Sequence, residues 1–237
     1  MEGAAPATIN RELSALKRAL RLAQLAGRVV SRPEFVRLEE KNRRREFFDA
    51  AELEALLQNL PGHLRPVIYT AYVTGWRISS EILTRKRHHL DLDSGHLRID
   101  PEDKRDSTGR SFPLTPELRE LLDQQLVKTG DLERKKGQII PWLFHREGKP
   151  IRDFRKAWNQ ACQRAGLNGK LPDDLRRTAV RNLERAGVSR PAAMALVGHR
   201  SDSIYRGIPA IGHSVLKESA AKLAALHESL KVSGTVK

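Results

Sequence analysis

The sequence is poor in the residues that would place it outside a reducing compartment. It has one cysteine, Cys162, in 237 residues, so no internal disulfide can form, and this favours a cytoplasmic protein. One cysteine and scattered histidines also give no zinc-ligand spacing, so we expect neither a metal nor a cofactor. Cys162 lies in "AWNQACQRAGL" and is predicted to be a small core residue rather than a reactive thiol.

Long apolar runs are absent as well. No stretch approaches the roughly 20 apolar residues that a membrane span needs. The N-terminus, "MEGAAPATINREL", lacks the basic start and apolar middle of a signal peptide. We therefore expect no membrane partner. Apolar residues make up 39% and charged residues 30% of the chain, a balance that is typical of a globular protein.

What the chain has in excess is positive charge. It contains 43 Lys and Arg against 29 Asp and Glu, which gives a formal net charge of +14. Such an excess attracts polyanions through a force that is sensitive to salt and independent of sequence. A basic structural or RNA-binding protein fits the same charge. Charge therefore indicates a class of partner and names no function.

The apolar pattern predicts a mainly α-helical fold with a small antiparallel β-sheet, an α+β architecture. Residues 8–26 have the pattern of an amphipathic helix with Thr8 as its N-cap. At Asp49 a capping box in "DAAE" opens a second helix, which Pro61-Gly62 ends. Another helix, "LRPVIYTAYVTG", follows it.

The middle of the chain changes to a period of two. "HHLDLDSGHLRID" predicts two short strands with a turn at Asp93–Gly95, and "GRSFPL" predicts one more strand. A helix then begins at Thr115-Pro116. The remaining predicted helices cover 151–165, 174–186, 190–197 and 214–230.

Three stretches contain residues suited to chemistry on phosphate: "TGWRISSEIL" with Arg77, "PDDLRRTAVRNLERAGV" with Arg176 and Arg177, and "ALVGHR" with His199. Together they resemble the motifs of the tyrosine recombinase, or phage integrase, family. The order and the spacing match, since His199 lies 23 residues after Arg176. A resemblance of three motifs in order is far more specific than "TGxR" alone.

The resemblance implies double-stranded DNA as the partner and breakage and rejoining of DNA as the family's activity. It implies that Arg77 and Arg176 clamp one backbone phosphate, while His199 donates a further hydrogen bond. Guanidinium groups suit this task because they bind two phosphate oxygens at once and stay charged at any ordinary pH. Arg177 is expected to face solvent or to contact phosphate.

The resemblance also divides the chain. Residues 1–30 resemble the last helix of the family's core-binding domain, and residues 49–237 its catalytic domain. Residues 31–48 are expected to form a basic linker, with the cluster Lys41, Arg43, Arg44 and Arg45, which either faces DNA or is a charge run exposed to solvent. Because family members hold DNA between two domains, we expect a truncated clamp of reduced affinity. The helix at 214–230 is expected either to pack on its own chain or to offer a surface for a second copy or an intact integrase.

Two positions around the clamp depart from the family pattern. The residue three before the second arginine is usually His, and here it is Asp173. We expect Asp173 to pair with Arg176 or another arginine and to withdraw it from phosphate. The family's hairpin lysine falls at Arg105, with Lys104 one residue earlier on the opposite strand face. A guanidinium is a poor general acid for the leaving oxygen.

The third departure concerns the nucleophile. The family's tyrosine lies nine residues after the histidine, which here is Ile208, and Pro209 follows it. Tyr205 is one helical turn away, about 5 Å, which is too far for in-line attack. The sequence thus predicts a family member that binds DNA without cutting it. An active recombinase that uses Tyr205, and a basic structural or RNA-binding protein, remain as alternatives.

Overall fold

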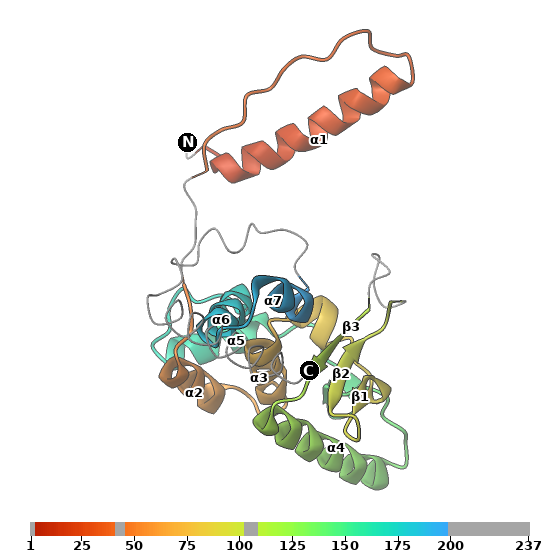
Figure 1. Ribbon diagram of the computed structural model, residues 1–237, viewed down its shortest axis with the longest axis vertical. Coiled ribbons are helices and arrows are strands. Elements are labelled where there is room, and N and C mark those ends of the chain that lie inside the picture. Colours follow the sequence, from red (N-terminus) through yellow and green to blue (C-terminus); the bar gives the residue numbers. More distant parts are fainter. Residues whose placement is uncertain (1–2, 41–45, 102–108, 199–237) are drawn as a thin grey trace, which may run out of the picture. The chain divides into compact units, whose positions relative to one another are not determined.

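A computed structural model describes residues 3–40, 46–101 and 109–198. The chain divides into two compact units, residues 1–45 and residues 46–237. The described part is mainly helical with small antiparallel sheets, which confirms the predicted α+β architecture (Figure 1). None of the described helices combines the length and the apolar character of a membrane span.

The first unit consists of helix α1, Pro6–Leu25, and an extended segment that follows it. The helix starts two residues earlier than predicted, because Pro6 occupies its first turn, and Ala5 rather than Thr8 is the N-cap. The Asn10 side chain ties the extended segment to the helix. Its amide exchanges two hydrogen bonds of 2.9 Å with the backbone of Leu38 and donates one of 2.7 Å to Glu40.

The second unit contains six α-helices among the residues described, and two short turns of other helix types. The α-helices are α2 Ala50–Asn59, α3 Arg65–Thr74, α4 Pro116–Lys136, α5 Arg155–Arg164, α6 Pro172–Arg185 and α7 Arg190–Val197. The turns are the π-helical η1, Ile78–Ile82, and the 3₁₀-helical η2, Arg87–His89. Helix α5 starts four residues after its predicted start, since residues 151–154 are not helical.

Two small sheets lie beside these helices. Strands β1 Leu90–Asp91, β2 His96–Ile99 and β3 Arg110–Pro113 pair in the order β1-β2-β3, all antiparallel. The hairpin turn at Asp93–Gly95 and the strand in "GRSFPL" are therefore confirmed. Strands β4 His145–Arg146 and β5 Lys149–Pro150 form a second hairpin, which the sequence did not predict because each strand has only two residues.

The core of the second unit surrounds α3, which packs against α4 and α6, while α7 packs against α6 and β3. Trp76, Trp158 and Phe48 are among its largest fully buried side chains. Cys162 is buried in the same core. The predicted core position of this cysteine is therefore confirmed, and burial raises the pKa of its thiol to about 11.

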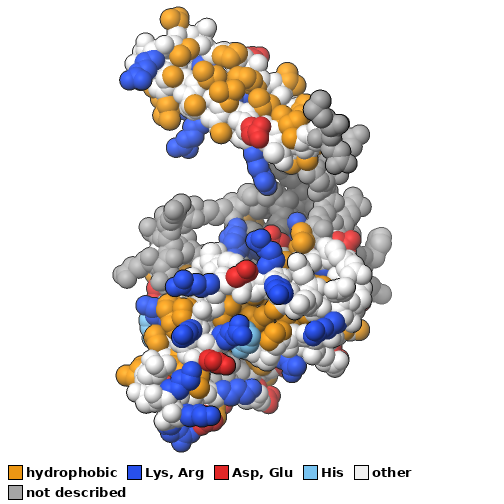
Figure 2. Space-filling view, turned by 180° about the vertical axis from the view of Figure 1, so that it is seen from behind, with side chains coloured by type: hydrophobic (Ala, Val, Ile, Leu, Met, Phe, Trp, Pro, Cys, Tyr) orange, Lys and Arg blue, Asp and Glu red, His pale blue; other side chains and the backbone are white. Residues whose placement is uncertain are grey.

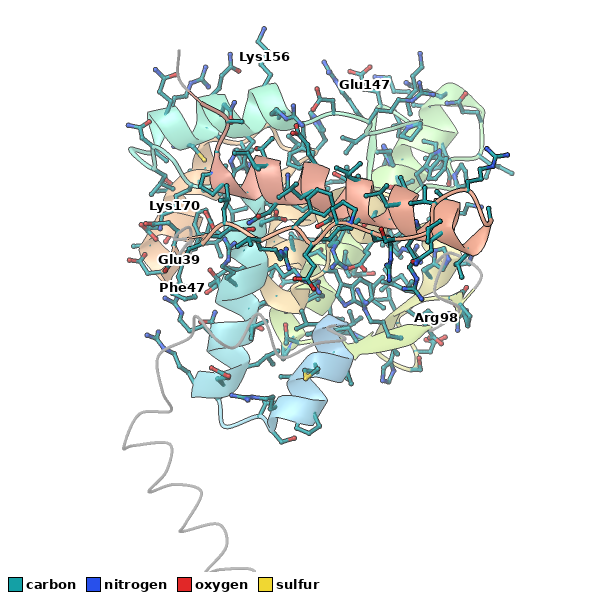
Figure 3. The ribbon with its side chains drawn as sticks, turned by 90° about the horizontal axis from the view of Figure 1, so that it is seen from above. Glu39, Phe47, Arg98, Glu147, Lys156 and Lys170 are labelled. Carbon is teal, nitrogen blue, oxygen red and sulfur yellow. The ribbon has the colours of Figure 1, made fainter. Side chains whose placement is uncertain are left out.

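The chain enters this unit through residues 46–48, which Lys170 holds in place. The Lys170 ammonium donates to the Phe47 carbonyl and lies 3.1 Å from the Glu52 carboxylate. It also lies 5.1 Å from the centre of the Phe48 ring. Lys170 and Phe47 lie together at one edge of the unit in Figure 3. The Phe48 backbone N–H also donates to Thr178 of α6, the helix that carries Arg176.

Candidate functional site

The guanidinium of Arg176 lies buried where two helices end. Its Nη1 donates to the carbonyls of Gly75, at 2.6 Å, and Val197, at 3.0 Å, while Nη2 donates to that of Gly198, at 3.3 Å. The last carbonyls of a helix have no partner within the helix. Gly75 caps α3 and Gly198 caps α7, both with positive φ. Arg176, from α6, therefore satisfies the ends of both helices at once.

A buried carboxylate, that of Glu81, gathers the basic side chains of the site. Its Oε2 accepts the Arg77 backbone N–H at 2.8 Å, and its Oε1 lies 3.3 Å from Nη1 of Arg77. Arg176 Nη1 stands 3.8 Å from Oε2. Glu81 belongs to the π-helical turn η1, in which Ile82 and Leu83 donate to carbonyls five residues earlier. Such turns are rare and occur frequently at functional sites.

Arg110, on strand β3, is a third guanidinium at Glu81 that the sequence analysis did not select. Its Nη2 donates to Glu81 Oε2 at 2.5 Å, and its guanidinium carbon lies 5.1 Å from the centre of the Trp76 ring. The signal was present in "GRSFPL". Arg110 lies two residues before the buried Phe112 and therefore on the same strand face. An arginine on the apolar face of a strand needs a specific partner.

The three guanidiniums carry three positive charges, and Glu81 supplies one negative charge among them. The pKa of Arg176 is lowered to about 10, first by burial and then by the charges of Arg77 and Arg110, while Glu81 opposes the shift. The pKa of Arg110 is lowered for the same first reason, burial. The Arg77 side chain is 55% exposed, whereas those of Arg110 and Arg176 are about 10% exposed. This arrangement favours an anion that approaches from the side of Arg77.

Asp173 is exposed in the first turn of α6, beside this site. The expected ion pair with an arginine does not occur between Asp173 and any residue that the structure describes. The Asp173 charge acts on Arg176 through space and raises its pKa, but this is the smallest of the influences on that pKa. The reason is the course of the Arg176 side chain, which leads to the ends of α3 and α7.

The neighbouring Asp174 binds the arginine that we expected to contact phosphate. Its Oδ1 accepts from Arg177 Nη1 at 2.6 Å, and its Oδ2 accepts the Leu171 backbone N–H at 2.7 Å. Arg177 keeps about a third of its side chain exposed. It can therefore reach an external anion only while it shares its charge with Asp174.

Several predicted site residues lie outside the described residues, so their positions relative to the three guanidiniums are not part of this geometry. They are Lys41, Arg43, Arg44, Arg45, Lys104, Arg105, His199, Tyr205 and Ile208.

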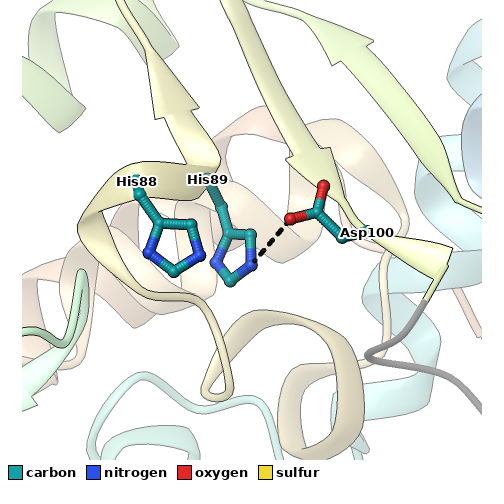
Figure 4. A group of neighbouring side chains, drawn as sticks. All are labelled: His88, His89 and Asp100. Carbon is teal, nitrogen blue, oxygen red and sulfur yellow. Dashed lines mark ion pairs between the residues drawn. The ribbon is translucent and has the colours of Figure 1, made fainter.

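A second polar cluster, His88, His89 and Asp100, lies at the outer end of β2 and has the composition of a metal site (Figure 4). The His89 Nδ1 accepts the Lys86 backbone N–H at 2.9 Å, so the ring proton lies on Nε2. That Nε2 faces Asp100 at 3.5 Å, and Asp100 also pairs with Arg98 at 3.7 Å. A protonated Nε2 has no lone pair for a cation, so the contacts favour an Nε2–H that faces the Asp100 carboxylate and helps to hold η2 to β2, rather than a metal ligand.

Comparison with known proteins gives the family. The model of the "Phage integrase family" matches residues 46–207 of the chain. The integrase of Salmonella phage P22 is 24% identical over an alignment of 235 residues, and the alignment covers 93% of this chain and 58% of that protein. This chain thus spans somewhat more than half the length of that relative.

Solved structures agree on the fold. The Tn1549 transposon integrase in complex with a circular intermediate DNA superposes with a TM-score of 0.73 and 16% identity, over 93% of this chain and 80% of that one. A lambda integrase dimer bound to a COC′ core site gives a TM-score of 0.62 and 21% identity, over 84% and 74%. Because the family model covers more than half of the sequence, the chain belongs to the phage integrase family of tyrosine recombinases.

Proposed function

We propose that this protein binds double-stranded DNA through a clamp on one backbone phosphate and does not cut the strand. The observation that carries the proposal is the excess of charge at the site, where three guanidiniums meet one buried carboxylate. A phosphate diester brings one negative charge and two free oxygens, and bidentate arginine contacts match both.

Duplex DNA fits this site better than a small free anion, for reasons beyond the site itself. The whole chain has a net charge of +14, and basic side chains lie across the face of the second unit in Figure 2. The Tn1549 and lambda integrases, which share the fold, were solved with DNA. We assign Arg77, Arg176 and His199 to the clamp, and Lys41, Arg43, Arg44, Arg45 and Arg177 to neighbouring phosphates.

The proposed lack of cleavage depends on the sequence after the third motif. Ile208 stands where the family has its tyrosine, and an alkyl side chain cannot attack phosphorus. The match to the family model ends at residue 207, one residue before that position. Pro209 also disfavours the helical conformation for Ile208. Arg105 at the lysine position would slow departure of the leaving oxygen further.

The test separates binding from cutting. The full chain is titrated against a radiolabelled duplex in a gel-shift assay, and in parallel it is incubated with a nicked suicide duplex that traps any covalent adduct. We expect a shifted complex and no adduct. Arg77→Gln should weaken the complex about tenfold, the loss expected for one charge-assisted contact. The charge-matched control Arg134→Gln should not, because α4 lies on the opposite side of the second unit from α7 (Figure 1).

Two results would contradict the proposal. An adduct that denaturation does not remove, and that disappears in Tyr205→Phe, would show an active recombinase with a displaced nucleophile. Equal affinity for double-stranded RNA of the same length would favour a general basic binding protein, since A-form RNA presents its phosphates in a different geometry.

A further inference from the structure

Of the three guanidiniums, that of Arg110 lies closest to the carboxylate at the centre of the site. Its Nη2 lies 2.5 Å from Glu81 Oε2, whereas Arg77 reaches Oε1 at 3.3 Å and Arg176 stands 3.8 Å away. We propose that Arg110 is a positioning residue, which neutralises Glu81 from inside the protein and so leaves the Arg77 guanidinium facing outward to a phosphate. This inference rests on the proposed function of the site.

The physical reason is competition for a buried charge. The Glu81 side chain is about 4% exposed, and an unpaired carboxylate at such depth is strongly unfavourable. It must attract the nearest mobile cation. Among the three guanidiniums, that of Arg176 is occupied by the carbonyls that end α3 and α7, whereas the exposed Arg77 can move. With Arg110 in place, Arg77 needs only a weak contact to Oε1 and keeps 55% of its side chain exposed.

Arg110 is suited to this task because it cannot leave its place. Strand β3 pairs Arg110 with Ile99 of β2, and the guanidinium lies against Trp76. On another side it contacts Gly198, where a Cβ atom would collide with Arg110 Nη1. A side chain at 198 would therefore displace the guanidinium. The glycine of "GHR" thus leaves room for Arg110, in addition to ending α7.

The hydrogen bonding of Arg110 indicates that its main role is to position Arg77, rather than to stabilise the fold. Among the described residues its buried Nε has no hydrogen-bond partner, and Glu81 is the one acceptor that they offer its guanidinium. A buried ion pair with unsatisfied donors adds little to stability and is often replaceable by apolar residues. The contacts of Arg110 therefore support an effect on Arg77 through Glu81.

The experiment measures the accessibility of Arg77 directly, without DNA. The full chain is treated with phenylglyoxal, an arginine reagent, and the modification rate of Arg77 is followed by peptide mass spectrometry. In Arg110→Gln we expect that rate to fall severalfold, because Glu81 draws Arg77 inward. The control Arg98→Gln removes an exposed arginine from the neighbouring strand β2 and should leave the rate unchanged.

The double variant Glu81→Gln/Arg110→Gln makes the test decisive, and it avoids an unpaired buried charge should Arg110→Gln fail to fold. Without the carboxylate, Arg77 should regain its wild-type modification rate, and DNA affinity lost in Arg110→Gln should recover. An unchanged Arg77 rate in Arg110→Gln would overturn the proposal. Lost affinity that does not recover in the double variant would also overturn it, because Arg110 would then contact phosphate itself. If wild type binds no DNA, the proposed function fails, while the Arg77 rates still decide the role of Arg110.

Discussion

At the scale of residues, the site depends on Gly75, whose carbonyl accepts a hydrogen bond from Arg176. Gly75 ends α3 with φ near +66°, and its carbonyl accepts the Arg176 hydrogen bond of 2.6 Å, which is shorter than those to Val197 and Gly198. A Cβ atom there would lie 2.9 Å from Val197 Cγ1 and 3.0 Å from the Ala179 Cβ. The glycine of "TGWR" therefore allows the left-handed backbone conformation that ends α3 and the close packing of α3 on α6 and α7. Its carbonyl also helps to place Arg176.

Replacing that glycine should cost more than the backbone conformation alone. For Gly75→Ala we expect a loss of about 2–4 kcal/mol in the free energy of unfolding, from left-handed strain and overpacking together. Gly137→Ala is the matched control. Gly137 caps α4 at φ +64°, but no described atom lies within 4 Å of the place that an alanine Cβ would take, so this variant should lose only about 1–2 kcal/mol. Urea unfolding measures both, and equal losses would show that the packing against Val197 is unimportant.

At the scale of elements, α6 connects the site to the point where the chain enters the second unit. The Thr178 hydroxyl accepts the Phe48 backbone N–H at 2.8 Å, and Arg181 donates to the Phe48 carbonyl at 2.8 Å. The Arg181 guanidinium also lies over the Phe47 ring. Since Arg176 belongs to the same helix, any shift of α6 toward or away from residues 46–48 moves the site with it.

The hydroxyl of Thr178 should therefore matter for stability. Thr178→Val leaves the buried Phe48 N–H without its acceptor, and we expect a loss of about 1–3 kcal/mol in unfolding free energy. Thr70→Val is the control, because Thr70 is equally buried but its hydroxyl donates to the Pro66 carbonyl within its own helix. That variant should lose under about 1 kcal/mol. Thermal unfolding compares the pair, and a smaller effect at 178 than at 70 would contradict this role of α6.

The helices, strands and turns also differ in how well the sequence predicted them. The start of α4 and the limits of α7 followed from local signals, the Thr115 cap before Pro116 and the glycine at 198. The π-helical turn at Glu81 and the contact of Arg110 with it did not, because that contact joins residues 29 positions apart. The motifs predicted that Arg77 and Arg176 would meet. They could not show that a carboxylate joins them or that Asp173 stays outside.

At the scale of the whole molecule, the two units differ in how they are stabilised. In the described part of the first unit, Asn10 is the one buried residue, and apolar side chains of α1 such as Leu22 and Leu25 are exposed. Helices gain most of their stability from packing an apolar face. The second unit has that packing, with Leu118 and Leu122 of α4 fully buried.

Hydrogen exchange should reveal this difference. We expect the amides of α1 to exchange within seconds to minutes at neutral pH, while those of α4 stay protected far longer. The two helices make a fair pair because they have 20 and 21 residues. Mass spectrometry of pepsin fragments after deuterium labelling gives the rates. Protection of α1 equal to that of α4 would mean that the apolar face of α1 is covered in solution.

The net charge of the whole molecule predicts how its DNA affinity responds to salt. Each phosphate neutralised by Lys or Arg releases counterions, so the logarithm of the affinity falls with the logarithm of the salt concentration at about −0.9 per contact. With the clamped phosphate and at least two of the neighbouring phosphates neutralised, the slope should be about −2.7 or steeper, a loss of roughly 40-fold or more between about 50 and 200 mM salt. Arg77→Gln should bring the slope closer to zero by about 1, and Arg134→Gln should leave it unchanged. Fluorescence anisotropy with a labelled duplex measures these slopes, and a flat wild-type slope would show that DNA is not bound through its phosphates.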